Sequence, residues 1–244
     1  MPLLAFNNQT AVVTGASSGV GKVISLALAA QGASLCLVGR RSEVIEAVAE
    51  CARANASKVV VCQADLEIDE DIRRLKDRLH SEFSSIDLLV HSAGVISIGA
   101  FESAPVEDFD RQYRVNVRAP YLLTQVLLPM LRTSRGQVVF INSLVGLSAK
   151  GNSAQYSATK HALKALADSL RQEVNQDGLR VLSVFLGRTA TPLQAAVHRL
   201  EGRTYKPELL VKPEDVAGAV LHTLSLPRSV EVTDITIRHA LKTA

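Results

Sequence analysis

The stretch TAVVTGASSGVG, residues 10–21, decides the fold. Its first part, Thr10–Thr14, is a short apolar and β-branched run that predicts a buried strand. Three glycines with the spacing G-x3-G-x-G follow, and an apolar helical run, Val23–Ala30, comes next. Glycines in such a turn let the backbone approach a pyrophosphate, and the helix N-terminus adds free N–H groups and a positive dipole end. The stretch therefore predicts a phosphate-binding turn between a first strand and a first helix.

Strand and helix patterns alternate along the rest of the chain. Further strands are expected at Ser34–Val38, Lys58–Cys62, Asp87–Val90, Gln137–Asn142, Arg180–Phe185 and Thr233–Arg238. Helices are expected at Ser42–Asn55, Glu70–Phe83, 106–133, Tyr156–Val174 and Pro213–Leu224. Apolar strands that alternate with helices indicate a parallel sheet covered on both faces. We therefore expect one α/β domain over residues 1–244, a doubly wound parallel sheet of the Rossmann type with about seven strands, and a ligand crevice at their carboxyl ends.

Composition and charge argue against several classes of protein. The 244 residues, 47% of them hydrophobic and 21% charged, are typical of a globule with a sizeable core. There is no Trp, and the net charge of +3 is spread along the chain, so we expect no nucleic-acid partner; only the pI near 8.8 favours one. Because neither a long apolar run nor a basic leader is present, we expect a cytoplasmic protein with no membrane contact.

The three cysteines, Cys36, Cys51 and Cys62, lie in or beside apolar runs. None of them has the spacing of a CxxC pair or of a Cys/His ligand set. We therefore expect buried or half-buried free thiols in a reducing compartment, and no metal site.

Further motifs follow the glycine turn in a fixed order. Asp65 comes after the third strand, Ala93-Gly94 after the fourth, and Asn116, Ser143 and the run YSATK at 156–160 come later. Together with T-G-x3-G-x-G, these motifs resemble the short-chain dehydrogenase/reductase family over roughly residues 8–237. The resemblance implies a nicotinamide-dependent oxidoreductase that transfers hydride between the cofactor and a small carbonyl or alcohol substrate.

The resemblance also indicates which cofactor to expect. Gly39 stands where NAD-preferring members carry Asp, and Arg40 follows it, as in NADP-preferring members. An arginine accepts a 2′-phosphate through charge-assisted bonds, and Ser17 adds a hydroxyl donor. We therefore expect NADP(H), with an adenine ring held by Asp65 and Leu66. The expected cofactor contacts are Gly15, Ser17, Ser18, Gly19, Val20, Gly21, Arg40, Arg41, Asp65, Leu66, Ala93, Gly94, Tyr156, Lys160, Gly187, Thr189 and Thr191.

Tyr156 and Lys160 lie four residues apart, on one face of an expected helix. A nearby ammonium lowers the pKa of a tyrosine, so Tyr156 can give a proton to a carbonyl oxygen or take one from an alcohol. The hydroxyl of Ser143 can hydrogen-bond the same oxygen. By resemblance, Lys160 also binds the nicotinamide ribose, and Asn116 interrupts the long helix and holds a water on its backbone carbonyl. The expected catalytic residues are Asn116, Ser143, Tyr156 and Lys160.

Three places depart from the family pattern. Leu186 replaces the usual Pro of the turn that contains Gly187 and Thr191, which makes that turn less rigid. Ser92 replaces an Asn that supports the central strand, and His91 beside it is expected to be structural, because Tyr156 already fills the acid/base role. The basic C-terminal tail lacks the D-G-G turn that supports tetramer packing in many relatives.

Substrate contacts are expected from Val95–Gly99, Leu144–Ser153 and 193–207, with Ser143, Val145 and Leu193 nearest the substrate. Segment 193–207 is expected to be a loop that acts as a mobile lid. The apolar residues of the helix at 156–174 favour a homodimer or a homotetramer. The sequence leaves the identity of the substrate and the direction of reaction open. It also leaves an alternative, a non-catalytic NADP-binding regulatory or scaffold protein of the same fold.

Overall fold

Seven parallel strands form one sheet in the computed structural model, which describes residues 5–240. The strands are β1 (Thr10–Thr14), β2 (Ser34–Gly39), β3 (Val59–Gln63), β4 (Leu88–His91), β5 (Gln137–Ser143), β6 (Arg180–Leu186) and β7 (Asp234–Ile237). Their order is β3-β2-β1-β4-β5-β6-β7, so the winding reverses between β1 and β4. A ligand crevice is expected at the carboxyl ends of strands at such a switch point.

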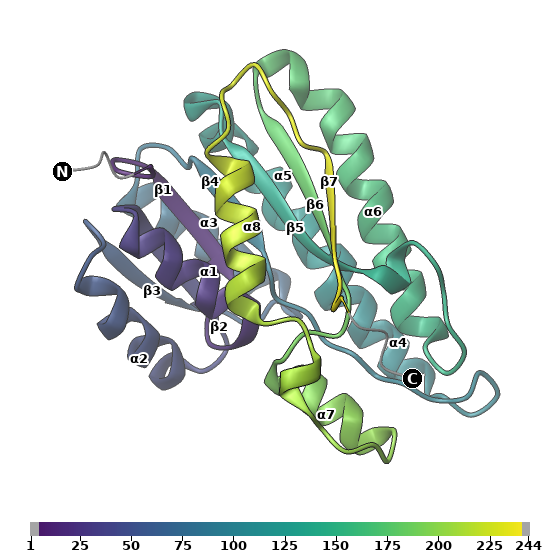
Figure 1. Cartoon of the computed structure of the whole chain (residues 1–244). Helices are drawn as coiled ribbons and strands as arrows, with labels where there is room; N and C mark the ends of the chain where they lie inside the picture. The colour runs from purple at the N-terminus through teal and green to yellow at the C-terminus, as the bar shows by residue number, and fades with distance from the viewer. Residues whose placement is uncertain (1–4, 241–244) are drawn as a thin grey trace.

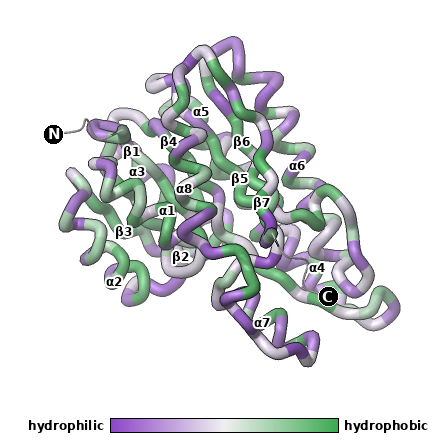
Figure 2. The backbone as a smooth tube through the Cα atoms, viewed as in Figure 1, coloured by the Kyte–Doolittle hydropathy of each residue, from purple (hydrophilic) through white to green (hydrophobic). Residues whose placement is uncertain are grey.

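Helices cover both faces of this sheet (Figure 1). They are α1 (Gly19–Ala30), α2 (Ser42–Arg53), α3 (Asp69–Glu82), α4 (Val106–Tyr113), α5 (Ala119–Ser134), α6 (Ala154–Val174), α7 (Pro192–Leu200) and α8 (Pro213–Leu224). Residues of α1, α2 and α8 share one apolar cluster, and residues of α3, α5 and α6 share the other. Val13 of β1 faces the first cluster and its neighbour Val12 faces the second. Figure 2 shows the hydrophobic colour concentrated in the strands between these layers. The doubly wound sheet predicted from the sequence is confirmed.

Several predicted element bounds are wrong. Helix α1 begins at Gly19 rather than at Val23, because the glycine turn leads directly into it. The interruption expected at Asn116 is confirmed: the helix expected over 106–133 is divided into α4, a π-helical turn at Arg114–Arg118, and α5. A π-turn carries an extra residue in the helical ladder and occurs frequently at functional sites.

Among the cysteines, Cys36 and Cys62 are buried, with sulfur atoms 3.4 Å apart, but Cys51 is exposed. The expectation that all three would be at least half-buried is therefore wrong for Cys51, which lies on the outer face of α2. Within residues 5–240, no helix is long and apolar enough to cross a bilayer.

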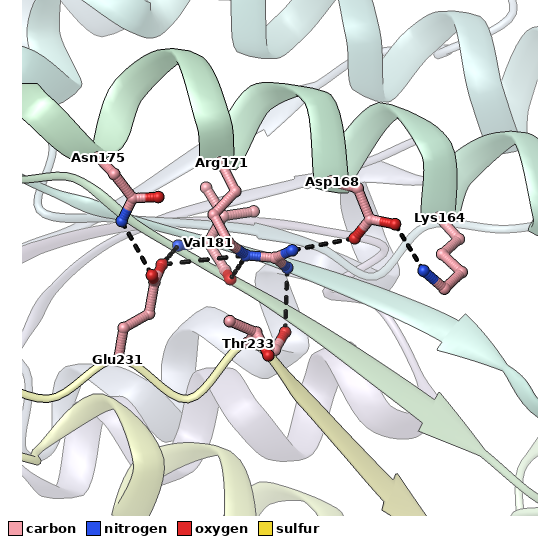
Figure 3. A network of polar contacts seen from close by, with 7 residues as sticks. All are labelled: Lys164, Asp168, Arg171, Asn175, Val181, Glu231 and Thr233. Carbon is pink, nitrogen blue, oxygen red and sulfur yellow. Dashed lines mark hydrogen bonds and ion pairs between the residues drawn. The ribbon is translucent and has the colours of Figure 1, made fainter.

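Strand β7 lies at the edge of the sheet and is tied to α6 by a polar network (Figure 3). Arg171 of α6 donates to the backbone oxygens of Val181 and Thr233 at 3.1 Å each. The carboxylate of Glu231 accepts from the backbone N–H of Val181 and from the side chain of Asn175. These bonds fix the segment that leads into β7, which pairs with β6 at the edge of the sheet.

Candidate active site

A cleft of about 1430 Å³ runs along the carboxyl ends of the strands. Typical small-molecule pockets have volumes of roughly 300–1,000 Å³, so this cleft has room for a dinucleotide and a second molecule. Most of the site residues expected from the sequence line it: Gly15, Ser17, Ser18, Gly19, Val20, Arg40, Arg41, Asp65, Leu66, Ala93, Gly94, Ser143, Val145, Tyr156, Lys160, Gly187, Thr189, Thr191 and Leu193. Gly21 and Asn116 do not line the cleft, so they support the residues that line it rather than contact a ligand directly.

The glycine turn leaves no room for side chains. Gly15 has a φ of +68°, and a Cβ built there would lie 2.8 Å from the backbone of Ala93. A Cβ on Gly21 would lie 2.5 Å from the carbonyl oxygen of Gly15. Ser18, the N-cap residue of α1, makes no side-chain cap bond, so the first N–H groups of the helix have no side-chain partner from the cap. The turn therefore presents bare backbone and unpaired donors to the cleft.

Thr14 joins the ends of β1 and β4. Its hydroxyl donates to the backbone oxygen of Val90 at 3.3 Å and accepts from the N–H groups of Ser92 and Ala93 at 3.1 and 3.2 Å. These bonds support the central strands where the family's usual Asn is replaced by Ser92. Thr14 is the residue directly before Gly15 in T-G-x3-G-x-G, so the motif marks its position but not these bonds.

At one end of the cleft, next to β2, lie Arg40 and Arg41, both exposed. A carboxylate that the sequence analysis missed reaches this end from another element. Glu67, in the loop between β3 and α3, has its Oε1 3.9 Å from an Nη atom of Arg40 and 2.9 Å from the Nε of Arg111 on α4. The loop itself is held in place because the backbone N–H of Glu67 donates to the carboxylate of Asp65. No local sequence signal connects these residues, since Arg111 is 44 positions from Glu67.

Ser143, Tyr156 and Lys160 lie together at the end of β5 and on the first turns of α6, and the ends of β1 and β4 separate them from Arg40 and Arg41. The Nζ of Lys160 donates to the backbone oxygen of Ile141 at 3.0 Å and lies 5.8 Å from the centre of the Tyr156 ring. Behind them, the buried side chain of Asn142 donates to the backbone oxygen of Lys160 and accepts from the N–H of Ser143. Asn142 thus joins the end of β5 to α6, a role that its place beside Ser143 only hints at.

Burial controls the electrostatics of this group. It raises the pKa of the Tyr156 phenol to about 12, although a hydrogen bond with Ser143 acts in the opposite direction. Burial also lowers the pKa of the Lys160 ammonium to about 8. The expectation of a lowered pKa for Tyr156 is therefore wrong for this structure, because desolvation of the phenol is the largest effect and it raises the pKa. At neutral pH Tyr156 is protonated, which makes it a proton donor.

Asn116 lies in the π-turn and is buried. Its side chain accepts from the N–H of Val95 and donates to the oxygen of the same residue, both at 2.9 Å. It also donates to the hydroxyl of Thr159, the neighbour of Lys160. Asn116 therefore connects the loop after β4 to α6, and the water expected on its backbone carbonyl stays a prediction.

His91 is buried at the end of β4, as expected of a structural histidine. One ring nitrogen lies 2.8 Å from the hydroxyl of Thr124, and the ring stacks on Phe140 with centroids 5.0 Å apart. Burial lowers the pKa of His91 to about 3, so the ring is neutral at physiological pH.

The segment after β6 closes the cleft on another side. The lid expected as a loop over 193–207 begins instead with helix α7, whose first turn is capped by the hydroxyl of Thr191. The same Thr191 has its methyl group 3.1 Å from the point where a Cβ on Gly19 would lie. At the far end of α7, both Nη atoms of Arg188 bond the carboxylate of Glu201 at 2.7 Å. Thr191 thus lies against the glycine turn, and Arg188 fastens the end of the helix.

A family model described as short chain dehydrogenase matches residues 9–201. The chain belongs to the short-chain dehydrogenase family. An uncharacterized oxidoreductase of Staphylococcus aureus (strain USA300) is 31% identical to this short-chain dehydrogenase over 97% of the chain and 99% of its own length. An alcohol dehydrogenase from Thermococcus sibiricus, solved with 5-hydroxy-NADP, superposes with a TM-score of 0.88 at 26% identity, covering 97% and 98% of the two chains. A metagenomic short-chain oxidoreductase solved with NADP gives 0.84 at 27% identity, covering 98% and 100%.

The site of this short-chain dehydrogenase fits the nicotinamide dinucleotide that the family implies. The bare backbone at Gly15 and the uncapped start of α1 suit a pyrophosphate. At one end of the cleft, Arg40 and Arg41 supply charged donors for a phosphate, and Ser143 and Tyr156 supply hydroxyl groups on its far wall.

Proposed function

We propose that this short-chain dehydrogenase is an NADP(H)-dependent enzyme that interconverts a carbonyl compound and an alcohol, with Tyr156 as the acid/base. The observation that carries the proposal is the grouping of Ser143, Tyr156 and Lys160 on one wall of a cleft whose other end holds Arg40. The structures solved with NADP or a derivative of it support this choice of cofactor.

The proposed mechanism follows from the protonation states of these groups. NADPH supplies the hydride when it is bound. The hydroxyl groups of Ser143 and Tyr156 orient the substrate carbonyl oxygen, and Tyr156 donates its proton to that oxygen as the alcohol forms. Below its pKa of about 8, the Lys160 ammonium favours the phenolate that remains. In the reverse direction, the phenolate accepts the proton of the alcohol. The raised pKa of Tyr156 suits the direction of carbonyl reduction.

The wall beside the reacting group suits an apolar substrate. Val145 and Leu193 line the cleft, and Leu193 and Leu200 on α7 are 43% and 67% exposed. When a helix closes over an apolar ligand, its exposed leucines are removed from water, and this burial favours the closed position. We therefore propose that 193–207 is a lid that consists mainly of helix α7. The ion pair between Arg188 and Glu201 links the end of this helix to the segment after β6.

Replacing the phenol tests the proposed acid/base. The wild-type protein and Tyr156→Phe are assayed against a panel of aldehydes and ketones at the NADPH absorbance, and NADPH binding is titrated in parallel. We expect kcat to fall roughly 10²- to 10⁴-fold, with NADPH affinity nearly unchanged, because the phenol supplies the proton and the cofactor is bound mostly elsewhere. Tyr113→Phe, at a half-exposed tyrosine of α4, is the matched control and should keep full activity.

Two results would contradict this assignment. Turnover within about tenfold of wild type in Tyr156→Phe would exclude the phenol as acid/base. A wild-type protein that binds NADPH but reduces nothing in a broad panel would favour the non-catalytic NADP-binding alternative.

We also propose that the protein is a single domain and assembles as a homodimer or homotetramer. On α6, Leu163, Ala167 and Val174 are buried within the chain, whereas Ala158 is exposed and Ala162, Leu166 and Leu170 are half-buried, so this helix keeps apolar surface for the contact expected from the sequence. Further exposed apolar side chains lie on α4 and α5: Val106, Phe109, Tyr113 and Tyr121. These residues favour a partner surface on that layer, and sedimentation at micromolar concentration measures the resulting mass.

A further inference from the structure

Glu67 lies between two guanidinium groups at the adenosine end of the cleft. Its Oε1 accepts a hydrogen bond from the Nε of Arg111 at 2.9 Å, and the same oxygen lies 3.9 Å from an Nη atom of Arg40. The first distance is that of a charge-assisted hydrogen bond, and the second is a loose ion pair. The carboxylate is therefore committed to Arg111 and only weakly engaged with Arg40.

The three charges face different surroundings. Arg40 and Glu67 line the cleft, whereas Arg111 does not. The side chain of Arg40 is 55% exposed, and that of Glu67 only 25%. The pKa of Arg111 is raised, chiefly by its hydrogen bond to Glu67. Of the two arginines, Arg40 is therefore the one that can bind a ligand in the cleft. Arg111 offsets the charge of the Glu67 carboxylate from a position outside the cleft lining.

An unrestrained Glu67 would oppose phosphate binding in two ways. Its carboxylate would compete for the guanidinium of Arg40, and its negative charge would repel an incoming phosphate dianion. The bond to Arg111 reduces both effects, because it draws Oε1 toward α4 and offsets its charge. A group on α4 that lines no part of the cleft thereby influences what the cleft can bind.

We propose that Arg111 is a positioning residue for cofactor specificity: by holding Glu67, it keeps Arg40 free for the 2′-phosphate of NADPH. The proposal rests on the proposed NADP(H) dependence, and it adds two residues, Glu67 and Arg111, that sequence motifs do not mark. Replacing the two partners has opposite consequences. Losing Arg111 releases Glu67 onto Arg40, whereas losing the charge of Glu67 removes the competitor.

The experiment measures binding by calorimetry in the full-length protein, without turnover. NADPH, NADH, 2′-AMP and 5′-AMP are titrated into wild type, Arg111→Gln, Glu67→Gln and the double variant. The last two probes separate the 2′-phosphate from the rest of the cofactor. Arg118→Gln is the matched control, because Arg118 pairs with Asp69 from the same helical layer and has no part in the Glu67 cluster.

We expect Arg111→Gln to weaken NADPH and 2′-AMP roughly three- to tenfold and to leave NADH and 5′-AMP within about twofold, in keeping with partly exposed charges. Glu67→Gln should bind NADPH and 2′-AMP at least as tightly as wild type. In the Glu67→Gln background, Arg111→Gln should have no further effect, because the carboxylate through which it acts is gone. Arg118→Gln should match wild type for all four probes.

The outcomes distinguish this proposal from the proposed function. Unchanged NADPH affinity in Arg111→Gln, an equal loss for NADH, or the same loss in the Glu67→Gln background overturns the role of Arg111. A selective loss of NADH affinity in Glu67→Gln also overturns it, because Glu67 would then bind the ribose directly. A wild-type protein that binds neither NADPH nor 2′-AMP overturns both proposals.

Discussion

The two ends of the cleft hold their polar groups in different ways. At the reactive end, Asn116, Asn142 and Lys160 are buried, and each is bonded to backbone atoms of a neighbouring element. At the adenosine end, Arg40 is 55% exposed and its nearest carboxylate is a loose 3.9 Å away. Buried bonds resist both solvent and salt, whereas exposed charges are screened. The comparison teaches that buried bonds fix the residues proposed for proton transfer, while the residues proposed to select the cofactor rest on adjustable surface charge.

The glycine turn belongs to the rigid part, and Gly21→Ala should have the largest effect on cofactor binding. The new Cβ would lie 2.5 Å from the carbonyl oxygen of Gly15, so the turn must open. Overpacking typically costs about 1–3 kcal/mol, and we expect NADPH binding to weaken roughly a hundredfold because the turn is itself the binding surface. Calorimetric titration with NADPH measures this loss.

Gly218→Ala is the matched control for this change, because a Cβ on Gly218 of α8 meets nothing within 4 Å. It should bind NADPH normally and gain up to about 1 kcal/mol of stability, since alanine favours an exposed helix. Normal NADPH affinity in Gly21→Ala would show that the turn is adjustable and would break the comparison.

Asn142→Ala should have an intermediate effect that is confined to the reactive end. The change leaves the carbonyl of Lys160 and the N–H of Ser143 without their side-chain partner. We expect unfolding free energy to drop by about 1–3 kcal/mol and kcat to fall roughly tenfold, because Ser143 and α6 lose their common anchor. Thermal denaturation and steady-state kinetics measure the two effects.

The affinity for NADPH should change little in Asn142→Ala. That result would show that Asn142 positions the catalytic residues and does not affect cofactor binding. Asn175→Ala is the control, since the side chain of Asn175 bonds Glu231 at an exposed place far along α6. A loss of kcat in Asn175→Ala as large as that in Asn142→Ala would point to a general effect on α6.

Arg40→Ala should have the smallest effect, because its charge is exposed. Hydrogen bonds to charged groups contribute about 1.5–3 kcal/mol, and we expect the lower limit here, a loss of about tenfold for NADPH and almost none for NADH. Values of kcat/KM for both cofactors, at low and high salt, measure the preference; the difference should shrink as salt rises.

Gly39→Asp sharpens the same test. The new Cβ would lie 3.1 Å from the terminal methyl of Ile45, a flexible contact that a small shift relieves. Its carboxylate should repel the 2′-phosphate and accept ribose hydroxyl bonds, so NADPH weakens and NADH improves. If kcat/KM changed equally for NADPH and NADH in Arg40→Ala or in Gly39→Asp, the 2′-phosphate would be assigned to Arg41 or Ser17 instead of Arg40.

The fold and most of the cleft could be predicted because their signals are local. Apolar runs marked the seven strands, and the turns after β1, β3, β4 and β5 placed their motif residues at one edge of the sheet. Helix α7 was missed, although Thr191-Pro192 is a cap followed by a proline at the first helical position. The same residues resemble the family's cofactor turn, and that resemblance obscures the helix signal.

Other features had no local signal. The contact of Arg111 with Glu67 joins helix α4 to the loop between β3 and α3, which is far away in the chain, and no periodicity connects them. The raised pKa of Tyr156 depends on desolvation by the whole packed site, which the spacing of Tyr156 and Lys160 in the sequence does not reveal. The division of 106–133 was expected only by resemblance, because the hydrophobic pattern of a helix continues across a π-turn.

That π-turn makes the chain unequal in its tolerance of insertions and deletions. Removing one residue from Arg114–Arg118 would convert the turn to regular α-helix, in which each residue turns the axis by about 100°. The wide turn holds its extra residue without turning the helices on either side, so α4 and α5 would keep their relative orientation and Gln112 its bonds to Ser97 and Gln155. The loss would fall on the turn itself, where Asn116 bonds Val95. We conclude that this turn can lose one residue without shifting the wall of the cleft, and that the resulting loss is the link between Asn116 and the loop after β4.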